Sequence, residues 1–274
     1  MYSPSQISYI GHATVLIELD GVRLLTDPLL RNQVMHLRRW RILSRPVVQP
    51  RLDAVLISHL HFDHLDLPSL RLLDRSIPVI VPRGAGVILD RLNFRRIYEV
   101  SAGEVVQVGA VRVRATIARH SGERHPFGPV ADALGYLVEG SKTVYFAGDT
   151  DLFPEMASLA DRLDAALLPV WGWGPTLGAG HLDPWRAAQA LTLLRPALAV
   201  PIHWGTFYPV GMGWANPRFL QDPPYEFAHY ALRLAPDVRV RIVAPGHNIP
   251  LNIPGLARQP LDLGYKSYAN AVAR

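Results

Sequence analysis

The chain has 274 residues, of which 49% are hydrophobic and 19% charged, and it contains no cysteine. This composition is that of a folded globular protein and excludes an intrinsically disordered chain, and the length allows one large domain or two small ones. Without cysteine, disulfides and thiolate metal ligands are excluded, so any metal must be held by nitrogen and oxygen atoms. The formal net charge of +5 favours anionic partners.

The ends and the apolar stretches of the chain give no membrane or export signal. The N-terminus lacks the basic start and the apolar run of a signal peptide. Prolines and glycines interrupt the uncharged stretch at 197–217, which therefore predicts a strand and a loop and not a transmembrane helix. These features predict a cytoplasmic protein.

The first half of the chain predicts strands joined by short helices. Its apolar runs are rich in β-branched residues, and the run at 111–118 alternates apolar with polar residues as a half-buried strand does. The strands are expected at 7–18, 22–26, 53–58, 79–81, 105–108 and 111–118. Short helices are expected at 68–74 and 84–92.

The second half continues in the same style. Asp183 is a favourable N-cap and Pro184 a favourable first residue for a helix that ends near Leu194. The other helices are expected at 152–163 and 225–234, and the strands at 134–138, 144–147, 165–170, 197–202 and 238–243. Strands and helices alternate in both halves, which predicts a layered α/β architecture. No linker rich in Gly, Ser or charge separates the halves, so we predict one domain over 1–274.

The strongest chemical signal follows the apolar strand at 53–58. Three histidines and an aspartate fall within six residues there, in the order His59, His61, Asp63 and His64. In an extended turn His59 and His61 lie on one side, while Asp63 and His64 can reach a second position. Imidazole and carboxylate suit zinc, and also iron or manganese. A polar surface turn with incidental histidines is the alternative, but chance rarely produces this spacing at a strand end.

This segment resembles the signature of the metallo-β-lactamase superfamily. Further pieces of that signature follow in order, namely His120 after the strand at 111–118, Asp149 in Gly148-Asp149-Thr150, and His203 in 201–207. The resemblance extends from Ile10 to about His247 and implies an α/β fold, the four-layer αβ/βα sandwich of the metallo-β-lactamase type. It implies two divalent metal ions, with Zn²⁺ expected and Mn²⁺ or Fe²⁺ also compatible.

The resemblance also assigns the ligands. The first metal would be held by His59, His61 and His120, the second by Asp63, His64 and His203, with Asp149 bridging both. A histidine at position 61, where an acidic residue would suggest the di-iron redox branch, favours hydrolysis. His125 competes with His120 for the third histidine, but it precedes Pro126 in a loop, whereas His120 lies near a strand end where placement is rigid.

Five short motifs together resemble a narrower branch. They are Gly11-His12-Ala13-Thr14, Thr26-Asp27-Pro28, Gly148-Asp149-Thr150, His181-Leu182-Asp183-Pro184 and His203-Trp204-Gly205-Thr206-Phe207. The branch contains N-acyl-phosphatidylethanolamine phospholipase D and L-ascorbate-6-phosphate lactonase. Its substrates differ widely, so the resemblance does not identify the substrate of this chain.

The predicted function is that of a metal-dependent hydrolase in which a metal-bridging hydroxide attacks a carbonyl or phosphoryl centre. Asp63 would orient the hydroxide while it ligates, and His181 would assist the developing negative charge. The expected substrate is a small anionic ester or phosphodiester, phospholipid- or nucleotide-like. The alternatives are a lactonase acting on a sugar phosphate or other lactone, and a non-catalytic metal-binding protein. Long nucleic acid is not expected, because no exosite arm is visible.

A basic segment at 31–51 motivates the anionic substrate. It interleaves apolar residues with six arginines, which are Arg31, Arg38, Arg39, Arg41, Arg45 and Arg51. Such a segment can line a substrate entrance or contact a membrane surface. The alternative is a solvated basic surface, and the sequence leaves the oligomeric state open.

The remaining candidates have supporting roles. His12 and Asp27 are expected to orient ligands from behind, and Asp66 is a further candidate to hydrogen-bond a ligand histidine. His36 is expected either at the entrance or in solvent. Tryptophans at 171, 173, 204 and 214 can form an apolar wall for substrate, although core packing is the default for such residues. His229 and His247 receive no role.

Overall fold

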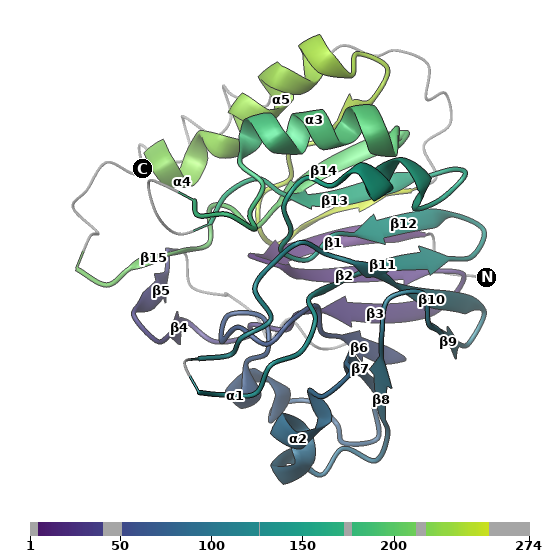
Figure 1. The fold of residues 1–274 in the computed structure, drawn as a ribbon, viewed down its shortest axis with the longest axis vertical. Helices are drawn as coiled ribbons and strands as arrows, with labels where there is room; N and C mark the ends of the chain where they lie inside the picture. The colour runs from purple at the N-terminus through teal and green to yellow at the C-terminus, as the bar shows by residue number, and fades with distance from the viewer. Residues whose placement is uncertain (1–4, 41–50, 126, 173–176, 212–217, 252–274) are drawn as a thin grey trace.

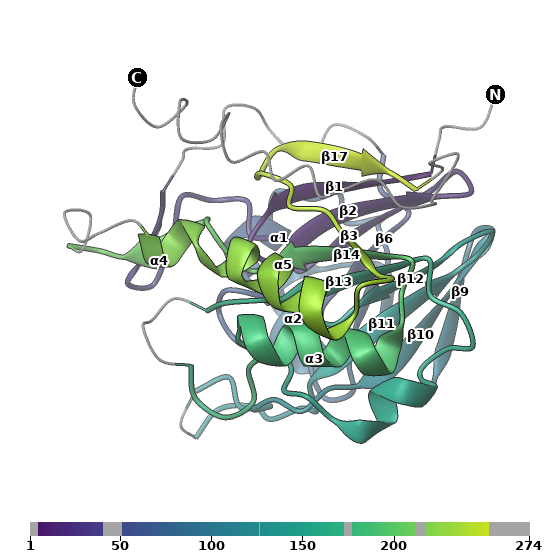
Figure 2. The same cartoon turned by 90° about the horizontal axis from the view of Figure 1, so that it is seen from above.

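Two β-sheets packed face to face, with helices on both outer sides, make up the protein (Figure 1, Figure 2). The computed structural model describes residues 5–40, 51–125, 127–172, 177–211 and 218–251. The layers run helix, sheet, sheet, helix, which confirms the predicted αβ/βα sandwich. The predictions for Arg41, Arg45, Trp173 and Trp214 lie outside the described residues, and the prediction of one domain over 1–274 stays a prediction.

The first sheet has seven strands in the order β17-β1-β2-β3-β6-β7-β8. Antiparallel pairing joins the first four, and β3, β6, β7 and β8 run parallel. Every residue of β2 is buried, as expected of a central strand covered on both faces. The strands are β1 (Gln6–Gly11), β2 (Thr14–Leu19), β3 (Val22–Thr26), β6 (Ala54–Leu56), β7 (Val79–Pro82), β8 (Ile97–Val100) and β17 (His247–Pro250).

The second sheet also has seven strands, in the order β16-β14-β13-β12-β11-β10-β9. Here β12, β13, β14 and β16 run parallel, and β9, β10, β11 and β12 pair antiparallel. The strands are β9 (Val105–Val108), β10 (Val111–Ile117), β11 (Leu134–Glu139), β12 (Thr143–Phe146), β13 (Ala165–Pro169), β14 (Leu198–Ile202) and β16 (Arg239–Val240).

Apolar side chains fill the spaces between the layers. Alternate residues of β2 point to opposite faces, so Val15 and Ile17 join the core between the sheets while Leu16 joins the outer cluster. That outer cluster is covered by α1 (Leu67–Leu70) and α2 (Gly86–Leu89), the latter continued by the 3₁₀ turn η1 (Asp90–Leu92). The second sheet is covered by α3 (Pro184–Leu194) and α5 (Pro223–Leu234), and α4 (Arg218–Gln221) precedes α5 (Figure 1).

A third, small sheet lies beside the sandwich and was not predicted. It has the order β15-β5-β4, with β4 (Gln33–Val34), β5 (Leu37–Arg39) and β15 (Phe207–Pro209). The strands β4 and β5 belong to the segment predicted as a basic loop. They form a hairpin because Val34, Leu37 and Phe207 pack with Leu29 in a cluster of their own.

Several predicted elements are wrong in extent or kind. The single strand at 7–18 is two strands, because Gly11 and His12 have φ values of 131° and 61° that turn the chain. The helix at 152–163 is only the 3₁₀ turn η2 (Pro154–Ser158), in which the Ser158 hydroxyl donates to the Glu155 carbonyl and competes with helical bonding.

A third is the strand at 238–243, which pairs only over Arg239–Val240 as β16. It flanks β14, where Pro201 has no N–H to extend a ladder. The predicted helix at 68–74 is shorter as α1, and the strands β8 and β17 were not predicted. In the described part of the chain, no helix combines the length and apolarity that crossing a bilayer requires.

Candidate metal centre

The predicted ligands meet at one edge of the sandwich, where strands of both sheets end. His59, His61, Asp63 and His64 follow β6 of the first sheet. His120 follows β10, Asp149 follows β12 and His203 follows β14, all in the second sheet. The carboxyl ends of parallel strands in one sheet lie at the same edge, which is why residues so distant in sequence converge. The structure brings all seven side chains together.

The first group consists of three imidazoles. His61 Nδ1 lies 3.0 Å from His59 Nε2 and 3.0 Å from His120 Nε2. Nitrogen ligands of a tetrahedral ion at about 2.0 to 2.1 Å stand about 3.3 Å from one another. Three lone pairs that converge at this spacing suit a cation between them better than hydrogen bonds among the rings.

The second group combines Asp63, His64 and His203. His203 Nε2 is 3.2 Å from His64 Nε2, and Asp63 Oδ2 is 3.7 Å from His64 Nε2 and 4.0 Å from His203 Nε2. His64 and His203 are buried and Asp63 is partly buried, so water cannot satisfy all of these groups. Their ligand atoms lie close enough to share one metal ion.

Asp149 lies between the two groups. Its Oδ2 is 3.4 Å from His64 Nε2 and its Oδ1 is 3.4 Å from His203 Nε2. On the other side it is grouped with His120 and His181. Oδ1 is buried and accepts no hydrogen bond from any described residue. Buried polar atoms are rarely left without a partner, so a bridging position for Asp149 between two cations fits this observation.

The protonation states of the site also favour metal binding. Burial lowers the pKa of His61 and of His203 to about 4, which leaves both rings neutral, as ligands must be. Burial would raise the pKa values of Asp63 and Asp149, but neighbouring histidines outweigh it and hold both well below the ordinary value. These are chiefly His64 and His12 for Asp63, and His203 and His64 for Asp149.

The pKa of His64 reflects the negative charge of the two carboxylates beside it. Burial lowers its pKa, but the charges of Asp149 and Asp63 outweigh burial and raise it well above the ordinary value of histidine. The buried Asp149 and the partly buried Asp63 therefore require positive charge beside them, which a bound metal ion would provide.

Asp27 supports both groups from behind. Its Oδ2 lies 2.8 Å from His64 Nδ1 and accepts from the Ser58 hydroxyl at 2.6 Å, and its Oδ1 accepts from the Ser58 backbone N–H. Ser58 Oγ is in turn 2.9 Å from His59 Nδ1. One buried carboxylate therefore orients a histidine of each group, as expected for Asp27.

His12 supports the second group. Its Nε2 is 2.9 Å from Asp63 Oδ2, and its ring lies 3.9 Å from that of His203. The backbone ties the same residues together, because the His203 N–H donates to the His12 carbonyl. His12 and His203 both have left-handed φ values, 61° and 62°, in residues that carry a Cβ, and such strained backbone clusters at functional sites.

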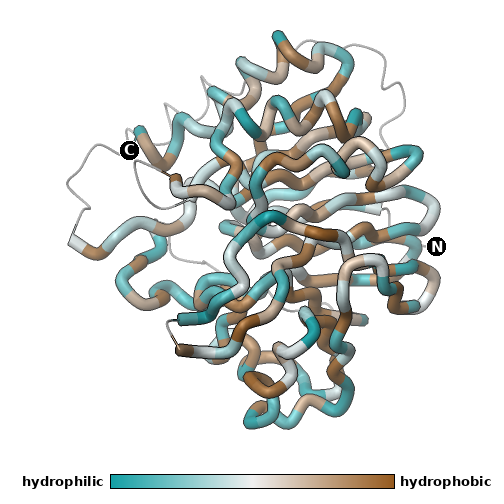
Figure 3. Tube along the Cα trace, viewed as in Figure 1, coloured by the Kyte–Doolittle hydropathy of each residue, from teal (hydrophilic) through white to brown (hydrophobic). Residues whose placement is uncertain are grey.

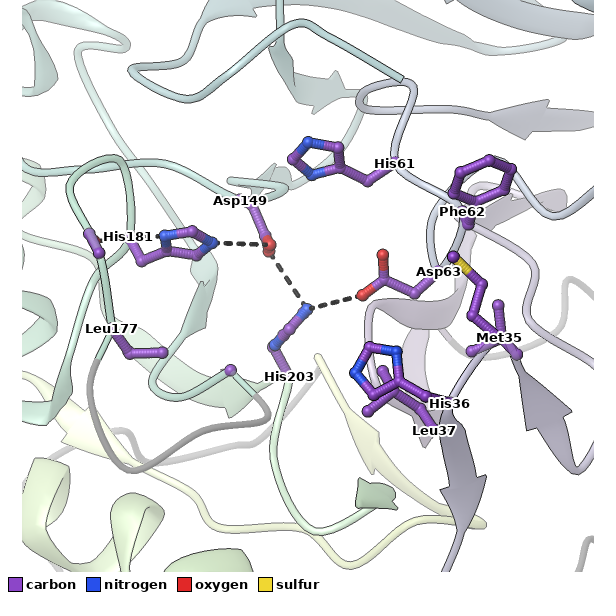
Figure 4. A pocket seen from close by; sticks show the side chains of 13 residues that line it. Met35, His36, Leu37, His61, Phe62, Asp63, Asp149, Leu177, His181 and His203 are labelled. Carbon is purple, nitrogen blue, oxygen red and sulfur yellow. Dashed lines mark hydrogen bonds and ion pairs between the residues drawn. The ribbon is translucent and has the colours of Figure 1, made fainter. Parts of the chain in front are cut away.

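The metal centre forms the floor of a pocket of about 340 Å³ (Figure 4). His181 stands at its side, with Nε2 3.9 Å from Asp149 Oδ2, and its side chain is 31% exposed. His36 lines the pocket, which is the first of the two positions expected for it. The other walls are Met35, Leu37 and Phe62 on one side and Leu177 on the other (Figure 4).

The sequence places Met35 and Leu37 in the segment expected at a substrate entrance, but it does not single out Phe62 or Leu177. Charge drew attention to the arginines of 31–51, whereas the pocket uses the apolar residues between them. The available signal was the run Val34-Met35-His36-Leu37, in which a histidine stands among apolar residues.

Asp66 differs from expectation, whereas the described tryptophans and His125 follow the interpretations that the sequence favoured. Asp66 contacts no ligand histidine but accepts from Arg31 and caps α1 through the Ser69 N–H. Trp204 packs in the core, where its Nε1–H donates to the Pro201 carbonyl, and Trp171 is buried as well. His125 is exposed and lies near Phe62, whereas His120 lies with His59 and His61.

Comparison with known proteins agrees with this geometry. Residues 22–204 match the family model of the beta-lactamase superfamily domain. A UPF0173 metal-dependent hydrolase of Methanopyrus kandleri is 30% identical over 250 residues, which are 89% of this chain and 98% of that protein. An uncharacterized protein of Mycobacterium tuberculosis is 32% identical over 231 residues, 77% of this chain, and the match covers 61% of that protein's length.

A solved structure shares the fold. It is that of a metallo hydrolase from Ignicoccus hospitalis, which superposes with a TM-score of 0.70 at 25% identity and covers 90% of this chain and 98% of that one. The chain therefore belongs to the beta-lactamase superfamily and, within it, to the family of UPF0173 metal-dependent hydrolases. The narrower resemblance to the phospholipase D and lactonase branch stays a prediction.

Proposed function

We propose that this protein is a hydrolase that uses two divalent metal ions to cleave an ester-class bond, whether carboxylic ester, phosphodiester or lactone, in a small molecule. The observation that carries the proposal is the position of Asp149 between two groups of ligands at the floor of a pocket. The donor set is nitrogen and oxygen only, which suits Zn²⁺, and also Mn²⁺ or Fe²⁺.

Metal ions held by these residues would supply Lewis acidity, which lowers the pKa of water to near neutrality and polarises the bond under attack. Asp63 is ionised, and His12 fixes one of its oxygens. The other oxygen points toward His61 (Figure 4), where it can accept a hydrogen bond from the attacking water and so orient it.

His181 would act on the opposite side. Its Nε2 faces Asp149 across 3.9 Å from the pocket wall, and its Nδ1 lies 3.3 Å from the Gly178 carbonyl. With Nδ1 protonated and bonded to that carbonyl, Nε2 accepts a proton, and a protonated ring can donate to a departing oxygen. His181 therefore suits leaving-group assistance without being needed as a metal ligand.

Metal content tests the premise. We expect about two ions per chain in the purified, reconstituted protein by elemental analysis, and loss of both in the His61→Ala, Asp149→Ala double variant. His229→Ala removes an exposed histidine on α5 and should leave the metal content unchanged. A native protein that binds no metal after reconstitution would contradict the proposal.

Activity tests the reaction class. The metal-loaded protein is assayed on a panel with a p-nitrophenyl carboxylic ester, bis(p-nitrophenyl) phosphate and a lactone. We expect hydrolysis of at least one class, with kcat lowered about 100-fold or more in Asp63→Asn and unchanged in Asp237→Asn, a surface control. A metal-loaded protein inert across the whole panel would favour the non-catalytic alternative.

A further inference from the structure

The pocket wall beyond the metal centre is apolar. Met35 and Leu37 of the β4–β5 hairpin and Phe62 form one side, and Leu177 stands opposite (Figure 4). Val34 completes the lining from the hairpin. These side chains come from three separate segments of the chain, so their apolar character is a property of the assembled pocket and not of one hydrophobic run.

The hairpin holds this wall in place. Leu37 pairs with Val34 across the hairpin and with Pro209 of β15. Leu37 and Val34 are buried against Phe207, whereas Met35 at the turn is 62% exposed and faces the pocket. An exposed Met at a pocket mouth gains buried area only when a ligand covers it.

Two arginines of this region, Arg31 and Arg39, are bonded away from the pocket. Arg39 is 4% exposed, donates to the Leu29 and Arg31 carbonyls, and lies over the Phe207 ring. Arg31 forms a two-pronged ion pair with Asp66. The charges of Arg31 and Arg39 therefore fix the hairpin and its surroundings.

Arg124 completes this pattern. Its guanidinium lies over the Phe62 ring, 4.2 Å from the centroid, and donates to the Leu60 and Leu65 carbonyls. It thus braces the back of Phe62 and does not line the pocket. Among the described residues that line the pocket, the side chains beyond the metal ligands are apolar or imidazole, and none is Arg or Lys.

We infer that the substrate carries an uncharged, apolar group next to its scissile bond and that this group packs against Met35, Leu37 and Leu177. The inference rests on the proposed function, because it takes the metal centre as the place of reaction. A volume of about 340 Å³ is near the small end of the pockets that hold small molecules. A carboxylate packed against Met35, Leu37 and Leu177 would be desolvated there, and no described Arg or Lys of the lining could pair with it.

Phosphonates test this without requiring turnover. Propylphosphonate and 2-carboxyethylphosphonate share the group that binds metal and differ in a methyl against a carboxylate at the tail. We expect propylphosphonate to bind the zinc-loaded protein at least about tenfold more tightly by calorimetry. Met35→Lys should lower or reverse this ratio, while Met35→Leu, which keeps the wall apolar, should preserve it.

Leu72→Lys adds the same charge at an exposed position outside the pocket and should leave the ratio unchanged. Equal or tighter binding of the carboxylate, or no binding of either phosphonate, would overturn the inference. A protein that shows the expected preference but hydrolyses nothing in the substrate panel would keep the apolar ligand preference of the pocket and contradict the proposed reaction, so the two failures are distinguishable.

Discussion

Asp27 is the residue on which both halves of the metal centre depend. His64 Nε2 can face a metal only when its proton is on Nδ1, and Asp27 Oδ2 lies 2.8 Å from that atom. The same oxygen accepts from Ser58, whose hydroxyl oxygen lies 2.9 Å from His59 Nδ1 and can accept its proton. A single carboxylate thereby selects the tautomer of one histidine in each group.

Asp27→Asn should therefore weaken metal binding while the fold persists, because the substitution keeps the size and shape of the side chain. The amide that replaces Oδ2 is a donor, so it opposes the N–H of His64 and the hydroxyl of Ser58. We expect zinc affinity, measured by competition with a chromophoric chelator, to fall about 10- to 100-fold at both positions.

Ser58→Ala is the matched control. It removes the support of His59 but leaves His64 bonded to Asp27. Only one of the two zinc ions should then bind more weakly. Equal zinc affinities in the native protein and in Asp27→Asn would show that Asp27 does not orient the histidines. It would then only hold the backbone, by accepting from the Ser58 N–H.

At the scale of elements, helix α3 shows how the second sheet is fixed on its outer face. Asp183 precedes it in an extended conformation and accepts from the Arg186 N–H at 2.7 Å. Asp222 holds the same position before α5, but no side-chain hydrogen bond caps that helix. The two aspartates therefore differ in the cap hydrogen bond and in backbone conformation, which is extended at Asp183 and helical at Asp222.

Asp183→Ala should lower the free energy of unfolding by about 1 kcal/mol, the usual contribution of an N-cap. That corresponds to a fall in melting temperature of about 2 to 4 °C by calorimetry. Asp222→Ala should change it by less than about 0.5 kcal/mol, since no cap bond is lost. Equal losses in the two variants would show that charge near the helix start, and not the cap bond, stabilises these helices.

The elements that the sequence predicted well are those with a local signal. The cap and proline before α3 and the alternation of β10 predicted their bounds closely, and the ligand histidines fall at strand ends that the apolar runs locate. The β4–β5–β15 sheet could not be predicted in the same way. Its strands are two or three residues long, and its partner strand Phe207–Pro209 lies about 170 residues away in sequence.

Dependence on contacts between residues far apart in sequence also explains why the sequence did not predict what the arginines of 31–51 bind. The sequence shows which arginines are present in 31–51 but not that Arg39 turns back onto the Leu29 carbonyl or that Arg31 meets Asp66. Those bonds depend on tertiary contacts, which net charge does not report. The metal ligands were easier to identify, because four of them lie within six residues and their chemistry restricts the alternatives.

For the whole molecule, a metal bound at the candidate centre would cross-link the two sheets. The segment after β6 belongs to the first sheet, while His120, Asp149 and His203 follow strands of the second. Neither sheet holds a complete ligand set by itself. Asp149 Oδ1, buried at the edge where the sheets meet, accepts no hydrogen bond from any described residue.

Metal should therefore stabilise the whole fold and not a local loop. A ligand that binds only the native state adds about 2.7 kcal/mol when its concentration is a hundred times Kd, so zinc should raise the melting temperature by about 5 °C or more over the chelator-treated protein. The His61→Ala, Asp149→Ala variant should show no such rise, and His229→Ala should show all of it. Hydrogen exchange with and without zinc tests whether the metal links the sheets, because opening of a bridged sandwich must expose both sheets together. Faster exchange on zinc removal that is confined to 59–64, with β12 and β14 as protected as before, would disprove the cross-link.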